Sequence, residues 1–135
     1  MRFIDILRWF ETGKIPTKAE RFLRQAEVGN AVARLKLGLC YYKGDGVPQD
    51  DREAIRLFRL ASQQGNAKAQ FYLGRAYGSG GGVSKNLEQA YMWFELAAAQ
   101  GDKKAAEWKS VVMKEMTPEQ IAEGNWLVQE KKGKL

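Results

Sequence analysis

The chain repeats itself across its central half. Residues 29–64 align with residues 65–100 without a gap, and 15 of the 36 aligned positions hold the same amino acid. A period of this length is typical of solenoids, in which each unit buries its apolar face against its neighbours and no unit is stable alone. This repeat constrains the fold more strongly than any single motif in the sequence.

Each repeat unit predicts a helix, a glycine loop and a second helix. Identical residues recur every three or four positions in two stretches, which is the spacing of one helix face. A glycine follows the second helix of each unit, at a position where a left-handed backbone is common. The scaffold positions are Ala31, Leu37, Gly38, Tyr41, Gly44, Gly46, Ala54, Phe58 and Ala61 in the first unit with Gly65 directly after it, and Ala67, Leu73, Gly74, Tyr77, Gly80, Gly82, Ala90, Phe94 and Ala97 in the second with Gly101 directly after it.

Two of these glycines, Gly38 and Gly74, lie inside predicted helices. Glycine there costs about 1 kcal/mol relative to alanine. Because the same unfavourable residue occurs in both copies, we expect close helix–helix contact at these points. An aromatic side chain of the partner helix, Phe58 or Phe94, is expected to lie over the glycine.

The glycine-rich stretch from Tyr77 to Asn86 resembles loops that hold phosphate groups. A phosphate-binding P-loop, however, requires a Gly-Lys-Ser/Thr sequence, which is absent here. The two copies of the loop share only Gly-x-Gly-Val, and the first copy carries acidic residues instead of a lysine. We therefore interpret the loop as a turn that joins two antiparallel helices.

The residue inventory argues against catalysis. The sequence has no histidine, which removes the usual general base and the commonest metal ligand. Cys40 is the single cysteine, so no disulfide can form within the chain, and its apolar helical setting predicts a buried, inert thiol. We expect no catalytic residue, no cofactor and no metal site, and thus a protein that is not an enzyme.

The two ends of the chain depart from the repeat but remain helical in pattern. At the start of the chain, residues 18–29 resemble a degenerate second helix, and residues 2–12 are predicted to be its partner. At the end, residues 102–115 and 118–131 are predicted to form a final helix pair, and Thr117 is the expected cap of its second helix. The expected fold is an all-α solenoid of about eight helices in a single domain. Its parts are a capping pair (1–28), two repeats (29–64 and 65–100), a degenerate third repeat with a capping pair (101–132) and a tail (133–135).

The repeat motif resembles a known family. Each unit is similar to the Sel1-like repeat, which is a relative of the tetratricopeptide repeat. The residues that carry the resemblance are A-x-A-x-x-x-L-G-x-x-Y-x-x-G-x-G-V, followed by A-x-x-x-F-x-x-A-x-x-x-G. The resemblance covers 31–65 and 67–101 and implies a right-handed superhelix that binds other proteins as an adaptor or scaffold. With no signal peptide or transmembrane segment in the chain, we expect a bacterial, cytoplasmic protein.

Positions that differ between the copies and lie exposed are free to bind a partner. On the first helix of each unit such positions run at i, i+4, i+7 and i+11, and in related repeats these helices line the concave face. A basic groove with tyrosines favours an acidic peptide or a C-terminal carboxylate. The candidate contacts are Val32, Lys36, Leu39, Tyr42, Lys43, Lys68, Tyr72 and Arg75, with Ser79 ending the second row.

Other functions remain open at this point. The net charge of +6 suggests a nucleic-acid or anionic-membrane binder, yet residues 37–102 are neutral and the excess lies at the ends. The apolar arc in Met1–Phe10 favours a cap on the solenoid, with membrane contact or self-association as alternatives. The family resemblance also allows an immunity protein that binds a cognate toxin.

Overall fold

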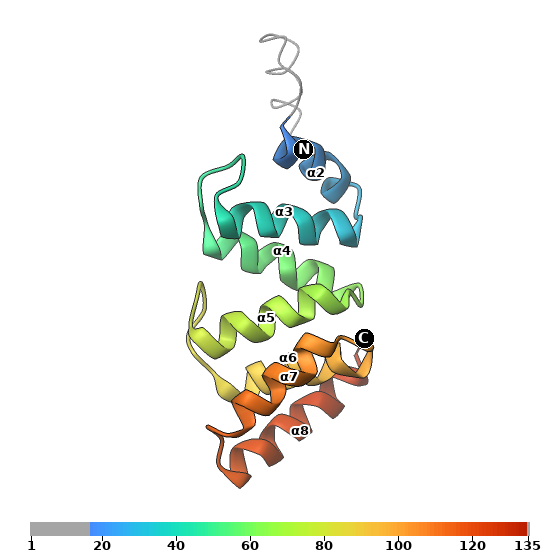
Figure 1. Ribbon diagram of the computed structural model, residues 1–135. Helices are drawn as coiled ribbons and strands as arrows, with labels where there is room; N and C mark the ends of the chain where they lie inside the picture. Colours follow the sequence, from blue (N-terminus) through green and yellow to red (C-terminus); the bar gives the residue numbers. More distant parts are fainter. Residues whose placement is uncertain (1–16, 135) are drawn as a thin grey trace.

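The computed structural model of the chain describes residues 17–134, which hold seven helices and no strand (Figure 1). The predicted helix at 2–12 and its capping role lie outside the described residues. The helices are α2 (Lys18–Glu27), α3 (Ala31–Lys43), α4 (Asp51–Gln63), α5 (Ala67–Ser79), α6 (Leu87–Ala99), α7 (Lys103–Met113) and α8 (Pro118–Lys132).

The helices pack in adjacent pairs that stack in one direction, from α2 at one end to α8 at the other (Figure 1). The helix boundaries follow the period of the sequence, because α5 begins 36 residues after α3 and α6 begins 36 residues after α4. The prediction of an all-α solenoid of antiparallel helix pairs is confirmed.

The first helix of each unit starts at the same kind of cap. The side chains of Asn30, Asn66 and Asp102 each accept a hydrogen bond from the backbone N–H three residues later, at 2.9–3.0 Å. These bonds satisfy an amide that the helix itself leaves unpaired. At the other end, α3 and α5 stop at Gly44 and Gly80, whose φ angles of +71° and +81° are left-handed and favour glycine.

The glycine loops are therefore structural turns. In both copies the residue that caps the next helix donates its backbone N–H to a tyrosine carbonyl of the preceding helix, Asp50 to Tyr41 and Asn86 to Tyr77, each at 2.9 Å. The loop is thus closed by its own backbone, as the comparison of the two copies predicts.

Close packing at Gly38 and Gly74 is also confirmed. A Cβ built on Gly38 would lie 2.6 Å from a ring carbon of Phe58, and one built on Gly74 would lie 2.6 Å from two ring carbons of Phe94. Both phenylalanines are fully buried. The absence of a side chain at these glycines lets α3 approach α4, and α5 approach α6, closely enough for the rings to pack on the backbone.

The two C-terminal helices, α7 and α8, both pack against α6 more than against each other. Thr117 and Gln120 form a reciprocal capping box at the start of α8, which confirms the predicted new start there. Gly124 then lies against the ring of Tyr91 on α6, and the Tyr91 hydroxyl donates a hydrogen bond of 2.5 Å to Asn125. Helix α8 therefore covers the side of α6 and closes this end of the core.

Candidate functional site

The row of variable positions lies along the first helices, α3 and α5, as predicted. Val32, Lys36, Lys43 and Lys68 are exposed, whereas Leu39, Tyr72 and Arg75 are half-buried. Tyr72 stacks on the core residue Phe58 with ring centroids 5.4 Å apart. The row therefore combines free cationic side chains with aromatic and aliphatic groups that are anchored in the core.

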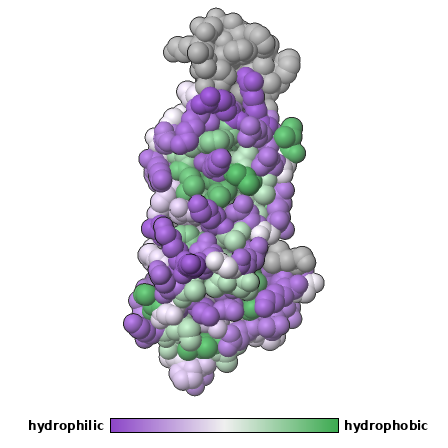
Figure 2. Space-filling model, turned by 45° about the vertical axis from the view of Figure 1, so that its right-hand side comes forward, coloured by the Kyte–Doolittle hydropathy of each residue, from purple (hydrophilic) through white to green (hydrophobic). Residues whose placement is uncertain are grey.

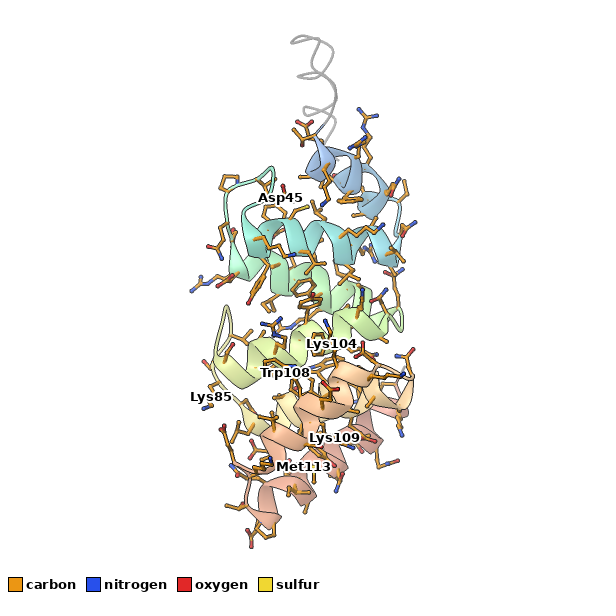
Figure 3. All side chains as sticks on the ribbon, viewed as in Figure 1. Asp45, Lys85, Lys104, Trp108, Lys109 and Met113 are labelled. Carbon is orange, nitrogen blue, oxygen red and sulfur yellow. The ribbon has the colours of Figure 1, made fainter. Side chains whose placement is uncertain are left out.

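The same row continues into α7, which the sequence comparison missed. Lys104, Trp108, Val111 and Glu115 stand 36 residues after Lys68, Tyr72, Arg75 and Ser79. Figure 3 shows Lys104 and Trp108 on α7, next to α5. The 36-residue period itself predicts these positions, but the repeat motif is lost within this helix, at Lys109 and Ser110.

Side chains from α3, α5 and α7 line one small cavity of about 230 Å³, here called the aromatic pocket. Residues of α6 form part of its wall. The lining residues are Tyr42, Arg75, Gly78, Ser79, Leu87, Phe94, Trp108, Val111, Val112 and Glu115.

Exposed apolar side chains cluster at the aromatic pocket. Six large apolar side chains are exposed in residues 17–134, and Tyr42, Trp108 and Val111 of this pocket are three of them, with exposed fractions of 39%, 40% and 52%. Figure 2 shows one face of the molecule, on which hydrophobic areas lie among hydrophilic ones. Because clustered apolar exposure is typical of binding sites, the pocket is the leading candidate.

Arg75 supplies the positive charge of the aromatic pocket. Its guanidinium carbon lies 5.1 Å from the ring centroid of Trp108 and 5.9 Å from those of Phe71 and Tyr72. No carboxylate within the described chain forms an ion pair with it. Aromatic contacts thus hold the guanidinium in place, and its charge is not neutralised by a neighbour.

The carboxylate of Glu115 stands at the same pocket. It lies 3.8 Å from the ammonium of Lys85, and both side chains are more than half exposed, so this ion pair is weak. The pocket therefore has a cation on α5 and a carboxylate just after α7.

Three of the predicted contacts line a second cavity, of about 320 Å³, between α2 and α3. Lys36, Leu39 and Lys43 face Phe22 there, and the Lys36 ammonium lies 5.4 Å from the Phe22 ring centroid. Cys40 also borders this cavity; burial raises the pKa of its thiol, and the nearby Asp45 carboxylate raises it further. The thiol is 3% exposed, which agrees with the inert role predicted for it.

The predicted residues are thus divided between two places. Tyr42, Arg75 and Ser79 line the aromatic pocket, and Lys36, Leu39 and Lys43 line the cavity at α2. Val32 and Lys68 lie outside the lining of both. Tyr72 contributes through its contacts with Phe58 and Arg75.

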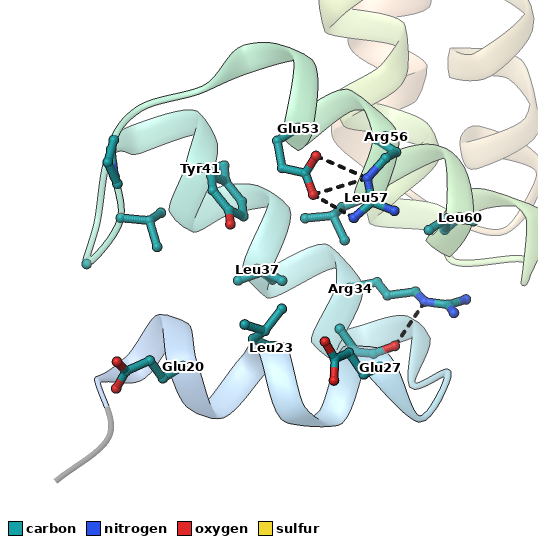
Figure 4. A pocket seen from close by; sticks show the side chains of 14 residues that line it. Glu20, Leu23, Glu27, Arg34, Leu37, Tyr41, Glu53, Arg56, Leu57 and Leu60 are labelled. Carbon is teal, nitrogen blue, oxygen red and sulfur yellow. Dashed lines mark hydrogen bonds and ion pairs between the residues drawn. The ribbon is translucent and has the colours of Figure 1, made fainter. Parts of the chain in front are cut away.

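A larger cavity of about 480 Å³ lies between α2, α3 and α4 (Figure 4). Two of its arginines are already engaged. Arg56 bonds the carboxylate of Glu53, which raises the pKa of the guanidinium, and Arg34 donates to the Ala26 carbonyl. These internal bonds make those groups less available to a ligand than Arg75.

Two further kinds of feature are absent from residues 17–134. No group of three or more acidic, cysteine or histidine side chains is placed to hold a metal ion there. None of the helices in that range is both long and apolar enough to cross a bilayer.

The sequence model of the Sel1 repeat matches this chain twice, at residues 31–66 and 67–102. These two matches cover more than half of the chain. The chain belongs to the Sel1 repeat family. Sel1 repeats generally serve as protein-interaction modules, and proteins with this fold are typically non-enzymatic scaffolds.

Two solved structures share this Sel1 solenoid. One is c5321, described as a protective antigen present in uropathogenic Escherichia coli strains and displaying an SLR fold. It is 31% identical, with a TM-score of 0.83 over 86% of this chain and 25% of its own. The other is a Sel1 repeat protein from Oxalobacter formigenes, 35% identical with a TM-score of 0.65 over 69% of this chain and 38% of its own.

The chain thus spans well under half the length of either structural relative. Among curated proteins, none matches it significantly.

Proposed function

We propose that this chain is a non-enzymatic interaction module that binds a protein segment along α3, α5 and α7, with the aromatic pocket as the centre of the contact. One observation carries the proposal. Three of the six exposed large apolar side chains of the described residues lie in this pocket, together with the Arg75 guanidinium, which has no ion-pair partner among those residues.

The chemistry of the pocket favours a peptide that brings an apolar group and a negative charge. Binding energy in protein interfaces is concentrated in aromatic and arginine side chains that are buried by the partner. Trp108 and Arg75 are of these types, and each is already oriented by its contact with the other. Little side-chain freedom would be lost on binding, which favours affinity.

The positive charge continues along the row beyond the pocket. Lys36 and Lys43 on α3 and Lys68 on α5 are exposed cations on the same helices. They would speed the encounter with an acidic segment without a fixed contact, an effect that weakens as salt screens exposed charges.

The proposal is tested by presenting the fluorescently labelled protein to a random hexapeptide library immobilised on two arrays. One array attaches each peptide through its amino end, and the other attaches it through its carboxyl end. We expect a set of peptides to bind the native protein, and Trp108→Ala to reduce the signal at least tenfold.

The matched control is Trp126→Ala, which removes another exposed tryptophan, on α8 and outside the pocket. This variant should bind like the native protein. Val111→Asp provides a second test, because Val111 is half exposed and the substitution leaves the core intact. Binding that survives both Trp108→Ala and Val111→Asp would refute the assignment of the pocket.

A further inference from the structure

We infer that the aromatic pocket recognises the last residue of a partner chain, with the apolar side chain of that residue inside the pocket and its α-carboxylate on Arg75. This inference rests on the proposed function and names the chemical group that it binds. Three features of the pocket lead to it: its size, the state of Arg75 and the position of Glu115.

The size of the pocket limits what can enter. At about 230 Å³ it is smaller than the roughly 300–1,000 Å³ of pockets that hold small molecules and cofactors. Its lining is mainly apolar in character, with Phe94 and Leu87 from α6 and Trp108 from α7. A single apolar side chain fits this space.

Arg75 limits the charge and the geometry of the ligand. Its guanidinium carbon lies 5.1–5.9 Å from the centroids of three aromatic rings, and a planar guanidinium presents its N–H donors along its edge. A carboxylate is the partner that matches this planar edge with two parallel bonds. No described carboxylate forms an ion pair with Arg75, so this place is open to a carboxylate of the ligand.

One residue of the ligand has to meet both requirements. In an extended peptide, successive side chains point to opposite faces, so an apolar residue and its acidic neighbour cannot both enter one small pocket. A C-terminal residue carries the apolar side chain and the carboxylate on the same Cα atom. It therefore satisfies Arg75 and the apolar lining together.

Glu115 argues against a longer acidic run. Its carboxylate lines the same pocket, so every further acidic residue of a ligand placed there would meet a like charge. A chain that ends at Arg75 brings one negative charge to the pocket and no residue beyond it. The arrangement thus favours an apolar C-terminus over a polyacidic segment.

The two peptide arrays test this inference directly. Peptides attached through their amino ends have free carboxylates, and those attached through their carboxyl ends have none. We expect binding only on the first array, restricted to peptides whose last residue is apolar. Equal signals on both arrays would overturn the inference while leaving the proposed function standing, whereas no signal on either array would contradict the proposed function itself.

Soluble peptides from the first array then give the magnitude. Converting the free carboxylate of the best peptide to an amide should weaken Kd about tenfold to a hundredfold, the range for a hydrogen bond to a charged group. Arg75→Gln should weaken binding of the free acid to the level of the amide and leave binding of the amide unchanged. Arg52→Gln, which removes an exposed arginine on α4 outside the pocket, should change neither value. An amide that binds as tightly as the acid would contradict the assignment of Arg75.

Discussion

Gly74→Ala is the substitution whose effect follows most directly from the packing of the repeat. The new Cβ would lie 2.6 Å from two ring carbons of Phe94 and 3.0 Å from a third. Real Cβ contacts are rarely closer than 3.4 Å, so the ring or the helix must move by close to an ångström. Phe94 is 0% exposed, so any displacement of its ring disturbs the packing of the surrounding core.

The net effect on stability is the sum of two opposing terms. Overpacking a filled core costs about 1–3 kcal/mol, and a fully buried ring favours the upper half of that range. Alanine regains about 1 kcal/mol of helix propensity over glycine. We therefore expect Gly74→Ala to lower the free energy of unfolding by about 1.5 kcal/mol, a fall in Tm of roughly 5 °C for a domain of this size.

Thermal and urea unfolding followed by circular dichroism measure this effect, and Gly78→Ala is the matched control. Gly78 lies four residues away on the same helix, and its nearest neighbour is the Ala90 Cβ at 3.8 Å, an ordinary contact. The control should gain between zero and about 1 kcal/mol from helix propensity alone. If Gly74→Ala were as stabilising as Gly78→Ala, the close-approach explanation of the repeated glycine would be wrong.

Three further outcomes follow from the structure. Thr117→Ala removes the acceptor of the Gln120 N–H at the start of α8 and should cost about 1 kcal/mol in urea unfolding, whereas Thr117→Ser should cost much less. Cys40 should react with Ellman's reagent far more slowly in the folded protein than in urea; fast labelling of folded protein would contradict its burial. Burial raises the pKa of the Cys40 thiol in the folded protein, so as pH rises past about 8.5 the thiol ionises in the unfolded chain first. Above that pH, the free energy of unfolding of the native protein should therefore fall more steeply than that of Cys40→Ala. Parallel pH profiles for the two proteins would refute that linkage.

The architecture could be predicted because its determinants are local or periodic. The gapless repeat set the helix boundaries, the cap residues marked their starts, and the unfavourable Gly38 and Gly74 identified the contacts with Phe58 and Phe94. Each of these signals lies within one unit. The division of the termini into capping pairs stays a prediction, as does the role of residues 1–16.

The candidate site could be predicted only in part. Tyr42 and Arg75 were identified from the difference between two copies, but the pocket needs Trp108 and Glu115 from a third unit that has lost the motif. Tyr42 and Glu115 line the same pocket only because helices of three successive units stack. A pairwise comparison of sequences carries no information on how deeply Tyr72 and Leu39 are buried in that stack.

The most direct test of the account is nuclear magnetic resonance of the labelled protein with the best free-acid peptide. The Arg75 side-chain Nε–H resonance and the backbone amides of Ser79, Trp108 and Val111 should shift on binding. The same peptide with an amidated C-terminus should leave the Arg75 resonance unmoved. Shifts confined to α4 or α8, or an Arg75 resonance that responds equally to both peptides, would contradict the central claim that this pocket reads a chain terminus.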